Sequence, residues 1–325
     1  MHSCVGALHT VTGIKLVPGV LVSTYIKTDR RANLVGSLWM VSAMAAFAVE
    51  DVFVKAASKT LPVGQVLFLF GLGGAFVFAC VAIGQKQRLF TLGAFSSLMR
   101  LRMLFETFGR LFYVLAIALA PLSAATVILQ ATPIVVVAGA TLIFGEKVGW
   151  QRWFAVFIGL AGVVVIVRPG TDSFSLFSIL AVLGMLGFAG RDLSSRAAPS
   201  TLSTSILGLY GFLSVVAAGV LYSIWDTAHF EWLAPQPTLY LSGAVIFGVV
   251  AYFGLMKAMR TGEVSTVTPF RFSRLIFGVG FGMLLFDEPL DGSMLAGCGL
   301  IVASGLFILW GSRRVVRVAG PPVLT

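Results

Sequence analysis

The chain has 325 residues, of which 58% are hydrophobic and only 11% are charged, and its formal net charge is +10. A soluble domain carries about 25% charged residues, so these few charges cannot cover a water-facing surface of this size, and the composition indicates an integral membrane protein. Nucleic-acid binding is not expected, because no basic tract with interleaved aromatic residues occurs and because membrane proteins collect Lys and Arg in their cytoplasmic loops.

Residues 1–33 form an apolar leader that is interrupted by His9, Lys15 and Pro18. The leader lacks the basic start and the small-residue cleavage site of a signal peptide. Three interpretations compete: a disordered or peripheral segment, an extra membrane span, or residues upstream of the start codon that is used. Lys15 would lie near the middle of such a span, which favours the first or the third interpretation.

Uncharged runs after the leader predict ten membrane-spanning helices, since a span needs about 20 apolar residues. The run Leu111–Gly145 is 35 residues long, too long for one helix, and Pro121 followed by Ser123 marks a turn and a new helix start within it. No strand pattern is found, so the expected fold class is an all-α integral membrane protein. The expected helices are 34–55, 64–84, 98–118, 122–144, 150–168, 175–196, 203–224, 237–259, 265–286 and 292–311, followed by a basic tail at 313–325.

Lys and Arg are distributed unevenly between the two ends of these helices. With the N-terminus inside, the inner side collects 16 of them and the outer side three. Positive residues concentrate on the cytoplasmic side, so both termini are predicted to be cytoplasmic in a multi-pass protein of the cell membrane, the inner membrane of a bacterium. An eleventh span in the leader would place the N-terminus outside instead.

The two halves of the chain repeat each other. Ser, Thr, Asp and Glu recur in register, which is rarer by chance than a match of Ala or Leu, and LIFGEKV aligns with LLFDEPL. Each repeat holds five spans, an odd number, so the two halves must be inverted in the membrane, which is the architecture of alternating access. An offset of 141 aligns Phe47, Asp51 and Lys55 with Phe188, Asp192 and Arg196, and an offset of 142 aligns Ser123, Thr126 and Glu146 with Ser265, Thr268 and Glu288.

The ten-span count, the block APLSAATVILQATPIVVVAGATLIFGEKV, the helix GLAGVVVIVRPG and the second LLFDEP resemble the drug/metabolite transporter superfamily, EamA type. The resemblance covers residues 34–312 and divides them into two EamA-type five-helix repeats, 34–170 and 171–312. It implies a central cavity lined by helices 1, 3, 4, 6, 8 and 9, with helices 5 and 10 peripheral. The chain departs from the family pattern at Thr261-Gly262-Glu263, where a small residue and Pro are usual, and in its arginine-rich ninth helix.

Charged residues within the spans are the candidate functional residues, because an ionisable group at bilayer depth costs at least about 2.5 kcal/mol and usually marks a pathway. Asp51 and Lys55 are spaced i, i+4, the favourable order for an ion pair on one helix face, and Asp192 and Arg196 repeat this spacing beside Arg191. These five residues are expected to form ion pairs at helix ends or to take part in gating.

Arginines near the middle of the membrane outnumber the acid counted with them. Glu106 and Arg110 share one helix face, and Arg271 and Arg274 are spaced i, i+3, where two cations repel unless an anion joins them. The surplus predicts a carboxylate or phosphate on the substrate; the alternative is that the arginines bind carbonyls at helix ends or lipid phosphates. Glu106 is expected either to pair with Arg110 or to couple transport to protons.

Aromatic side chains flank these charges and are the remaining candidates for substrate contact, with core packing as the alternative for each. Gln130 marks a polar kink in the helix expected at 122–144 and is a further candidate. The aromatic candidates are Phe47, Tyr113, Phe188, Tyr252 and Phe270.

The predicted function is secondary transport of a small organic metabolite by alternating access, the metabolite being amphipathic, aromatic or anionic, such as an amino acid, an organic acid or a vitamin. A channel-like or scaffold protein and a membrane-embedded enzyme are the alternatives, but no nucleophile–base pair is found and an enzyme is not expected. The scattered Cys and His residues predict neither a metal site nor a cofactor. The expected partners are membrane lipids and the substrate, and since no P-loop is present the driving force is proton coupling or exchange. The sequence indicates no oligomeric state.

Overall fold

A computed structural model of the chain describes residues 16–17, 20–21, 30–90, 93, 96–144, 150–167, 176–197, 202–226, 228–261 and 267–318. Most of the predicted leader therefore lies outside the described residues. Its described pieces are residues 30–33, which are helical and begin α1 (Arg30–Ala57), and two short strands, β1 (Leu16–Val17) and β2 (Val20–Leu21). The strands pair antiparallel and were not predicted. The other regular elements that are described are helical.

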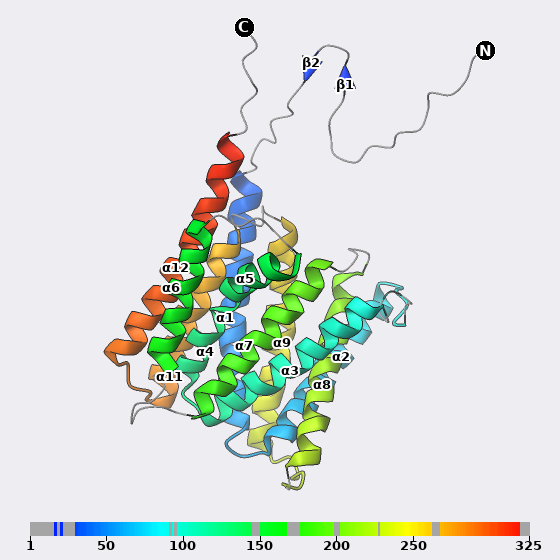
Figure 1. The fold of residues 1–325 in the computed structure, drawn as a ribbon. Helices are drawn as coiled ribbons and strands as arrows, with labels where there is room; N and C mark the ends of the chain where they lie inside the picture. The colour runs from blue at the N-terminus through cyan, green and yellow to red at the C-terminus, as the bar shows by residue number, and fades with distance from the viewer. Residues whose placement is uncertain are drawn as a thin grey trace, which may run out of the picture.

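Helices of membrane-spanning length form a bundle (Figure 1). Six helical stretches are long and apolar enough to cross a membrane, and two shorter apolar helices accompany them, so the prediction of a helical, multi-pass membrane protein is confirmed. In chain order the helices are α1 (Arg30–Ala57), α2 (Val63–Gly84), α3 (Ser97–Leu119), α4 (Leu122–Leu129), α5 (Thr132–Phe144), α6 (Trp150–Val167), α7 (Leu176–Ala197), α8 (Thr204–Trp225), α9 (Pro235–Thr261), the 3-10 helix η2 (Thr268–Phe272), α11 (Ser273–Phe286) and α12 (Gly292–Val318).

The ten predicted helices correspond to ten helical segments of the described chain, two of which are broken. α4 and α5 together form the predicted fourth helix, and η2 and α11 form the described part of the ninth. Pro133 accounts for the first break because it has no N–H to donate to the Leu129 carbonyl; the Thr132 hydroxyl donates to that carbonyl instead, at 2.5 Å. Pro269 lies in the 3-10 turn of the second.

The tenth helix is longer than predicted. α12 continues to Val318, so the first residues of the predicted basic tail at 313–325 are helical. Arg is a good helix former, and no Gly or Pro follows until Gly320 to end the helix.

α3 differs from the six apolar stretches because it carries Arg100, Arg102, Glu106 and Arg110. Its buried residues include Arg102 and Glu106 together with Tyr113, so these side chains point into the protein and not toward lipid. Charged side chains within a bilayer are tolerated where they face the bundle interior and pair with one another.

Five helix pairs make the most extensive contacts: α1 with α9, α3 with α7, α2 with α8, α6 with α12, and α4 with α11. The contact between α3 and α7 is close because glycines face each other, and a Cβ atom on Gly187 would lie 2.5 Å from Gly109 Cα. Small residues allow such backbone approach between membrane helices. This approach brings the charged face of α3 against α7.

The largest buried cluster includes Phe70, Tyr113, Ile128 and Phe212, from α2, α3, α4 and α8. Large apolar side chains elsewhere are exposed, as Phe76 and others along the helices show. A bundle that exposes apolar side chains while it buries charges is expected of a protein surrounded by lipid.

The two ends of the membrane region lie together. α1 begins and α12 ends at the same end of the bundle, while the connection between α11 and α12 lies at the opposite end (Figure 1). This arrangement agrees with the prediction that both termini face one side of the membrane. That this side is the cytoplasm stays a prediction.

Candidate functional site

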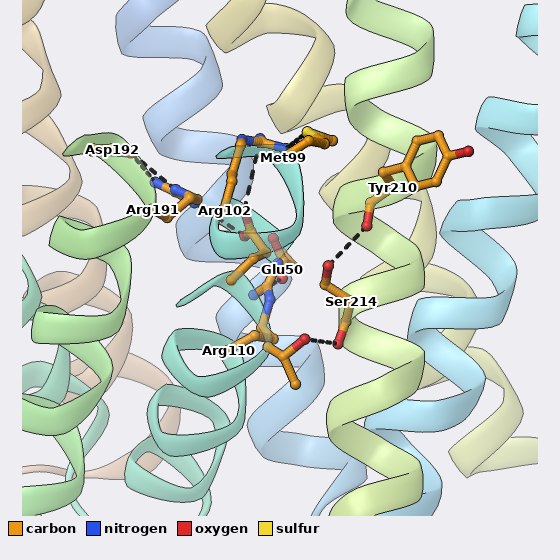
Figure 2. A network of polar contacts seen from close by, with 10 residues as sticks. Glu50, Met99, Arg102, Arg110, Arg191, Asp192, Tyr210 and Ser214 are labelled. Carbon is orange, nitrogen blue, oxygen red and sulfur yellow. Dashed lines mark hydrogen bonds and ion pairs between the residues drawn. The ribbon is translucent and has the colours of Figure 1, made fainter. Parts of the chain in front are cut away.

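Buried charges from α1, α3, α7 and α11 meet inside the bundle as three groups of ion pairs. Figure 2 shows the part of this network that contains Arg102, Arg110 and Arg191. Each group joins residues from distant parts of the sequence, so tertiary folding brings them together.

Asp51 is the centre of the first group. Its Oδ2 atom accepts hydrogen bonds from Arg274 Nη2 at 2.5 Å and from the Tyr113 hydroxyl at 3.0 Å, and its side chain is buried. The Arg274 guanidinium also lies 5.0 Å from the ring centre of Phe47 and 5.6 Å from that of Tyr113, as in cation–π contacts. This group joins α1, α3 and α11.

Glu50 and Arg110 form the second group (Figure 2). Arg110 Nη1 donates to Glu50 Oε1 at 2.9 Å, and the Glu50 side chain is 0% exposed. Glu106 was predicted either to pair with Arg110 or to couple transport to protons, and the pairing with Arg110 is not found, because Arg110 pairs with Glu50. Glu50 was not among the predicted site residues, although it is a second acid beside Asp51 in an otherwise apolar stretch.

Glu106, Arg191 and Asp192 form the third group, at the contact between α3 and α7, and Figure 2 shows Arg191 beside Asp192. Arg191 Nη1 lies 3.1 Å from Glu106 Oε1, and Arg191 Nη2 lies 2.8 Å from Asp192 Oδ1. Arg102 Nη2 lies 3.8 Å from Glu106 Oε2. The Arg191 guanidinium also lies 4.8 Å from the ring centre of Phe188, so aromatic rings accompany the arginines of the first and third groups alike.

Lys55 does not pair with Asp51, so that prediction was wrong. Lys55 Nζ donates to the carbonyl oxygens of Ile117 and Ala120, at 3.1 and 2.7 Å, and lies 3.4 Å from Glu288 Oε1. An ion pair on one helix face contributes only about 0.2–0.5 kcal/mol, whereas a buried charge requires hydrogen-bonding partners, which neighbouring helices supply. Asp51 and Lys55 therefore each turn to a different neighbour.

The arginine surplus predicted from sequence is smaller than expected. Arg110 and Arg274 are matched by two acids of α1 that the count had left out. Arg271, half-buried on η2, is the member of the predicted set that makes no ion pair within the described part of the structure. The predicted pair of Asp192 with Arg196 stays a prediction, because the Arg196 side chain lies outside the described residues.

A small cavity of about 20 Å³ lies between the second and third groups. Its lining includes Phe47, Glu106, Arg110, Phe212 and Tyr252. Ligand pockets measure about 300–1,000 Å³, while about 10–15 Å³ is enough for one water molecule. The described conformation is therefore closed around its centre.

Several buried polar atoms around this centre have no hydrogen-bond partner among the residues that the structure describes. They are Glu50 Oε2, Asp51 Oδ1, Arg110 Nε, Tyr252 Oη and Arg274 Nε. Buried polar groups are nearly always paired in proteins, and leaving one unpaired costs about 1–3 kcal/mol. A closed site with free donors and free acceptors is suited to a ligand that supplies both.

The remaining predicted residues differ in their distance from the charges. Phe188 packs against Tyr113, with ring centres 6.1 Å apart, within the core. Gln130 is buried at the end of α4 and is not part of the cavity lining. Phe270 is 42% exposed and lies in an apolar surface groove beside Leu34 of α1, so it faces away from the ion pairs.

No metal-binding arrangement accompanies these acids in the residues that the structure describes. No group of three His, Cys, Asp or Glu side chains there could hold a metal ion. The central carboxylates have guanidinium partners, an arrangement suited to holding charged organic groups.

The chain is similar to known transporters. Residues 34–168 match the model of the EamA-like transporter family. The chain is 25% identical to the S-adenosylmethionine uptake transporter of Rickettsia prowazekii (strain Madrid E), over 87% of this chain and 95% of the relative. It is 28% identical to the riboflavin transporter of Vibrio cholerae serotype O1, over 87% and 96%, and 26% identical to the pseudopaline exporter CntI of Pseudomonas aeruginosa, over 83% and 94%.

A solved protein chain shares the fold. It is 18% identical, covers 87% of this chain and 99% of its own length, and aligns with a TM-score of 0.60. The chain forms a multi-pass helical bundle with paired charges at its centre, and it is related over most of its length to proteins named as transporters. It is therefore a membrane transporter of small molecules and not an enzyme. The match of residues 34–168 to the EamA-like transporter family model confirms the predicted EamA type.

Proposed function

We propose that this protein is a secondary transporter of a small metabolite that carries both a negative and a positive charge together with an aromatic or other apolar part. The observation that carries the proposal is the closed central cavity, which is lined by Glu106 and Arg110 as well as by Phe47 and Tyr252. A substrate carboxylate would bind the Arg110 guanidinium, whose fork geometry suits it, and a substrate ammonium group would bind Glu106.

In the closed protein, Glu50 and Arg191 occupy the places of these two substrate groups. A zwitterion brings one charge of each sign, so the net charge of the buried site does not change when it replaces both protein partners. A ligand with a single charge would leave the buried site with one uncompensated charge, which is strongly unfavourable. The site therefore favours ligands with charges of both signs.

The anionic substrate predicted from sequence is the second candidate, and Arg271 supports it. Its guanidinium is half-buried and makes no ion pair with any residue that the structure describes. A purely anionic metabolite would be held there and would not need Glu106.

Alternating access between two inverted five-helix halves is the proposed mechanism, and the pattern of helix contacts supports it. Each span has a counterpart five spans away in the other half, so that α1 corresponds to α7 and α3 to α9. Replacing both helices of the pair α1–α9 by their counterparts gives the pair α7–α3, which makes the second most extensive helix contact. The pairs α2–α8, α6–α12 and α4–α11 are each converted into themselves. Such a pattern is expected when two similar halves are related by a two-fold axis in the membrane plane.

Individual contacts follow the same rule. A Cβ on Gly184 would lie 3.1 Å from Tyr113 Cα, and the offset of 141 converts this pair into Ala43 and Gly254, where a Cβ on the glycine would lie 3.2 Å from Ala43 Cβ. The offset of 142 aligns Gly162 with Ser304 and Gly159 with Ile301. Gly162 lies close to Ile301, and Gly159 correspondingly lies close to Ser304. These offsets were obtained from sequence alone, so the agreement supports the inverted repeat independently.

The first experiment tests the substrate class with matched ligands. Purified protein is heated with zwitterionic metabolites such as phenylalanine, and with analogues that lack one of the two charges, such as 3-phenylpropionate and 2-phenylethylamine. We expect a zwitterion to raise the melting temperature while its singly charged analogues do not. Stabilisation by the anions alone would favour the second candidate and the site at Arg271.

The second experiment measures counterflow of a stabilising ligand in proteoliposomes. We expect saturable counterflow, reduced at least about 100-fold in Glu106→Gln and in Arg110→Gln, because each change leaves one buried charge unpaired at a cost of about 3–5 kcal/mol. Lys257→Gln, a change at an exposed position of α9, is the matched control and should transport normally. Unsaturable flux would indicate a channel, and conversion of the ligand would indicate an enzyme.

We further propose that the protein lies in the cell membrane of a bacterium with both termini in the cytoplasm. The unequal distribution of Lys and Arg, 16 against three, supports this orientation. Proton coupling, with Glu106 as the acid, and exchange of one substrate for another are the two proposed driving forces, and counterflow with and without a pH gradient separates them.

A further inference from the structure

Glu288 lies in the connection between α11 and α12, and this connection is at the end of the bundle opposite the chain ends (Figure 1). Asp287 ends this helix in the left-handed conformation, with φ of 52°, and the Glu288 N–H bonds the Gly282 carbonyl at 3.1 Å. This type of helix end reverses the chain direction. A Cβ on Gly282 would lie 2.5 Å from Glu288 Oε2, so Gly282 leaves the space that the carboxylate occupies.

The Glu288 carboxylate is bound by the first residues of α4. Its Oε1 accepts from the Leu122 N–H at 2.6 Å, and its Oε2 accepts from the Ser123 N–H at 2.9 Å and the Ser123 hydroxyl at 2.6 Å. Pro121 precedes this helix and provides no side-chain cap. Glu288 therefore satisfies amide groups that an uncapped helix start would leave without partners, and its negative charge suits the positive end of the helix dipole.

Lys55 extends the same contact to two more helices. Its ammonium group lies 3.4 Å from Glu288 Oε1 and also donates to the carbonyls of Ile117 and Ala120 at the end of α3. The Lys55 and Glu288 side chains are 11% and 8% exposed. One carboxylate and one ammonium group thus hold α1, α3, α4 and α11 together.

These four helices belong to different halves of the chain. α1, α3 and α4 precede residue 170 and α11 follows it, so the contact fastens one proposed half to the other. Its chemistry also recurs in the sequence: the repeat offsets align Glu288, Ser123 and Lys55 with an acid, a hydroxyl and a base, at positions 146, 265 and 196. Those side chains lie outside the described part of the structure, so the recurrence is a property of the sequence alone.

We propose that Glu288 is a gating residue of the transport cycle. Its carboxylate holds the end of the bundle opposite the chain termini closed, and it must leave the start of α4 before that end can open to the extracellular side. The proposal rests on the proposed function, because alternating access requires such an opening and the cytoplasmic termini define the side. The three hydrogen bonds and the Lys55 contact are the interactions that opening would break.

The test measures the accessibility of a buried position beneath this contact. Thr126 is fully buried one turn beyond Ser123 and packs against Gly278 of α11. Thr126→Cys is introduced into a chain whose native cysteines are changed to Ser, and a membrane-impermeant thiol reagent is added outside intact cells. We expect Glu288→Gln to raise the labelling rate about tenfold or more, since hydrogen bonds to a charged acceptor are roughly twice as strong as neutral ones.

Asp287→Asn is the matched control. It removes the neighbouring exposed carboxylate, and Asn tolerates the left-handed conformation found there, so the labelling rate should not change. No increase with Glu288→Gln, or an equal increase with Asp287→Asn, would overturn the proposal. Ser123→Ala removes one of the three hydrogen bonds and keeps the acid, so it should give a smaller increase, which preserves the test if Glu288→Gln does not fold.

Labelling and transport give separable answers. Increased labelling without saturable counterflow would contradict the proposed function and leave the gating contact standing. Saturable counterflow with unchanged labelling would contradict the gating role of Glu288 alone.

Discussion

Arg274 lies where α1, α3 and α11 meet, and Asp51 neutralises its charge there. A buried ion pair of this kind is poor evidence for stability, because taking both charges out of water costs about as much as their attraction returns. What the pair does provide is position: one guanidinium is held by a carboxylate of α1 and lies beside a hydroxyl of α3. The ion pair therefore fixes the positions of α1, α3 and α11 relative to one another.

We expect Asp51→Asn to lower the free energy of unfolding by about 3–5 kcal/mol, because the variant leaves the buried Arg274 charge without its counter-ion. The double variant Asp51→Asn with Arg274→Gln should be more stable than this single variant, since no uncompensated charge remains. Denaturant unfolding in detergent micelles measures both. A double variant as unstable as the sum of the two single variants would contradict this explanation.

At the scale of helices, the close contact of α3 with α7 sets the geometry of the third ion-pair group. Gly109 and Gly187 let the two backbones approach, and this approach places Glu106 of α3 beside Arg191 of α7. A larger residue at either glycine would separate the helices, and the ion pair would lengthen with them.

Gly187→Ala should therefore destabilise the protein by about 1–3 kcal/mol, the usual cost of overpacking. Gly280→Ala is the matched control, because a Cβ at Gly280 of α11 would meet nothing within 4 Å, and Ala is about 1 kcal/mol better than Gly within a helix. Thermal unfolding of the two variants should move in opposite directions. Equal destabilisation would show that the contact between α3 and α7 is not the cause.

The sequence predicted the helices well because their signals are local. Uncharged runs set the number of segments, and Pro133, which breaks the fourth, lies within the segment that it breaks. The partners of the charges could not be predicted in the same way. Glu50 and Asp51 are neighbours in sequence, yet they pair with α3 and α11 respectively, and which helix each one faces depends on the packing order of the bundle.

At the scale of the whole molecule, exposed apolar side chains lie along the helices and the charges lie within, with a central cavity of about 20 Å³. A cavity of that size cannot hold a metabolite, so a substrate must enter another arrangement of the same helices. The proposed orientation, with both ends of the membrane region on one side, holds in either arrangement, because helix rocking does not change how often the chain crosses the bilayer.

Topology reporters test this orientation. A fluorescent protein that folds only in the cytoplasm should be bright when it is fused to the C-terminus, whereas alkaline phosphatase, which is active only outside, should be active when it is inserted after Lys59 or Pro289. The reason is the concentration of Lys and Arg at the ends of the helices assigned to the cytoplasm. An active phosphatase at the C-terminus would reverse the assignment, and opposite results for the two termini would contradict an even number of spans.

The pairing of Glu50 with Arg110 and of Asp51 with Arg274 has an electrical consequence. Each pair is a neutral unit, so moving it through the membrane field when the helices rearrange requires little work, although one elementary charge moved through 100 mV corresponds to about 2.3 kcal/mol. The membrane potential would then act on the bound cargo more than on these parts of the carrier. A zwitterionic cargo would leave that step nearly insensitive to voltage, whereas an anion would make it electrogenic.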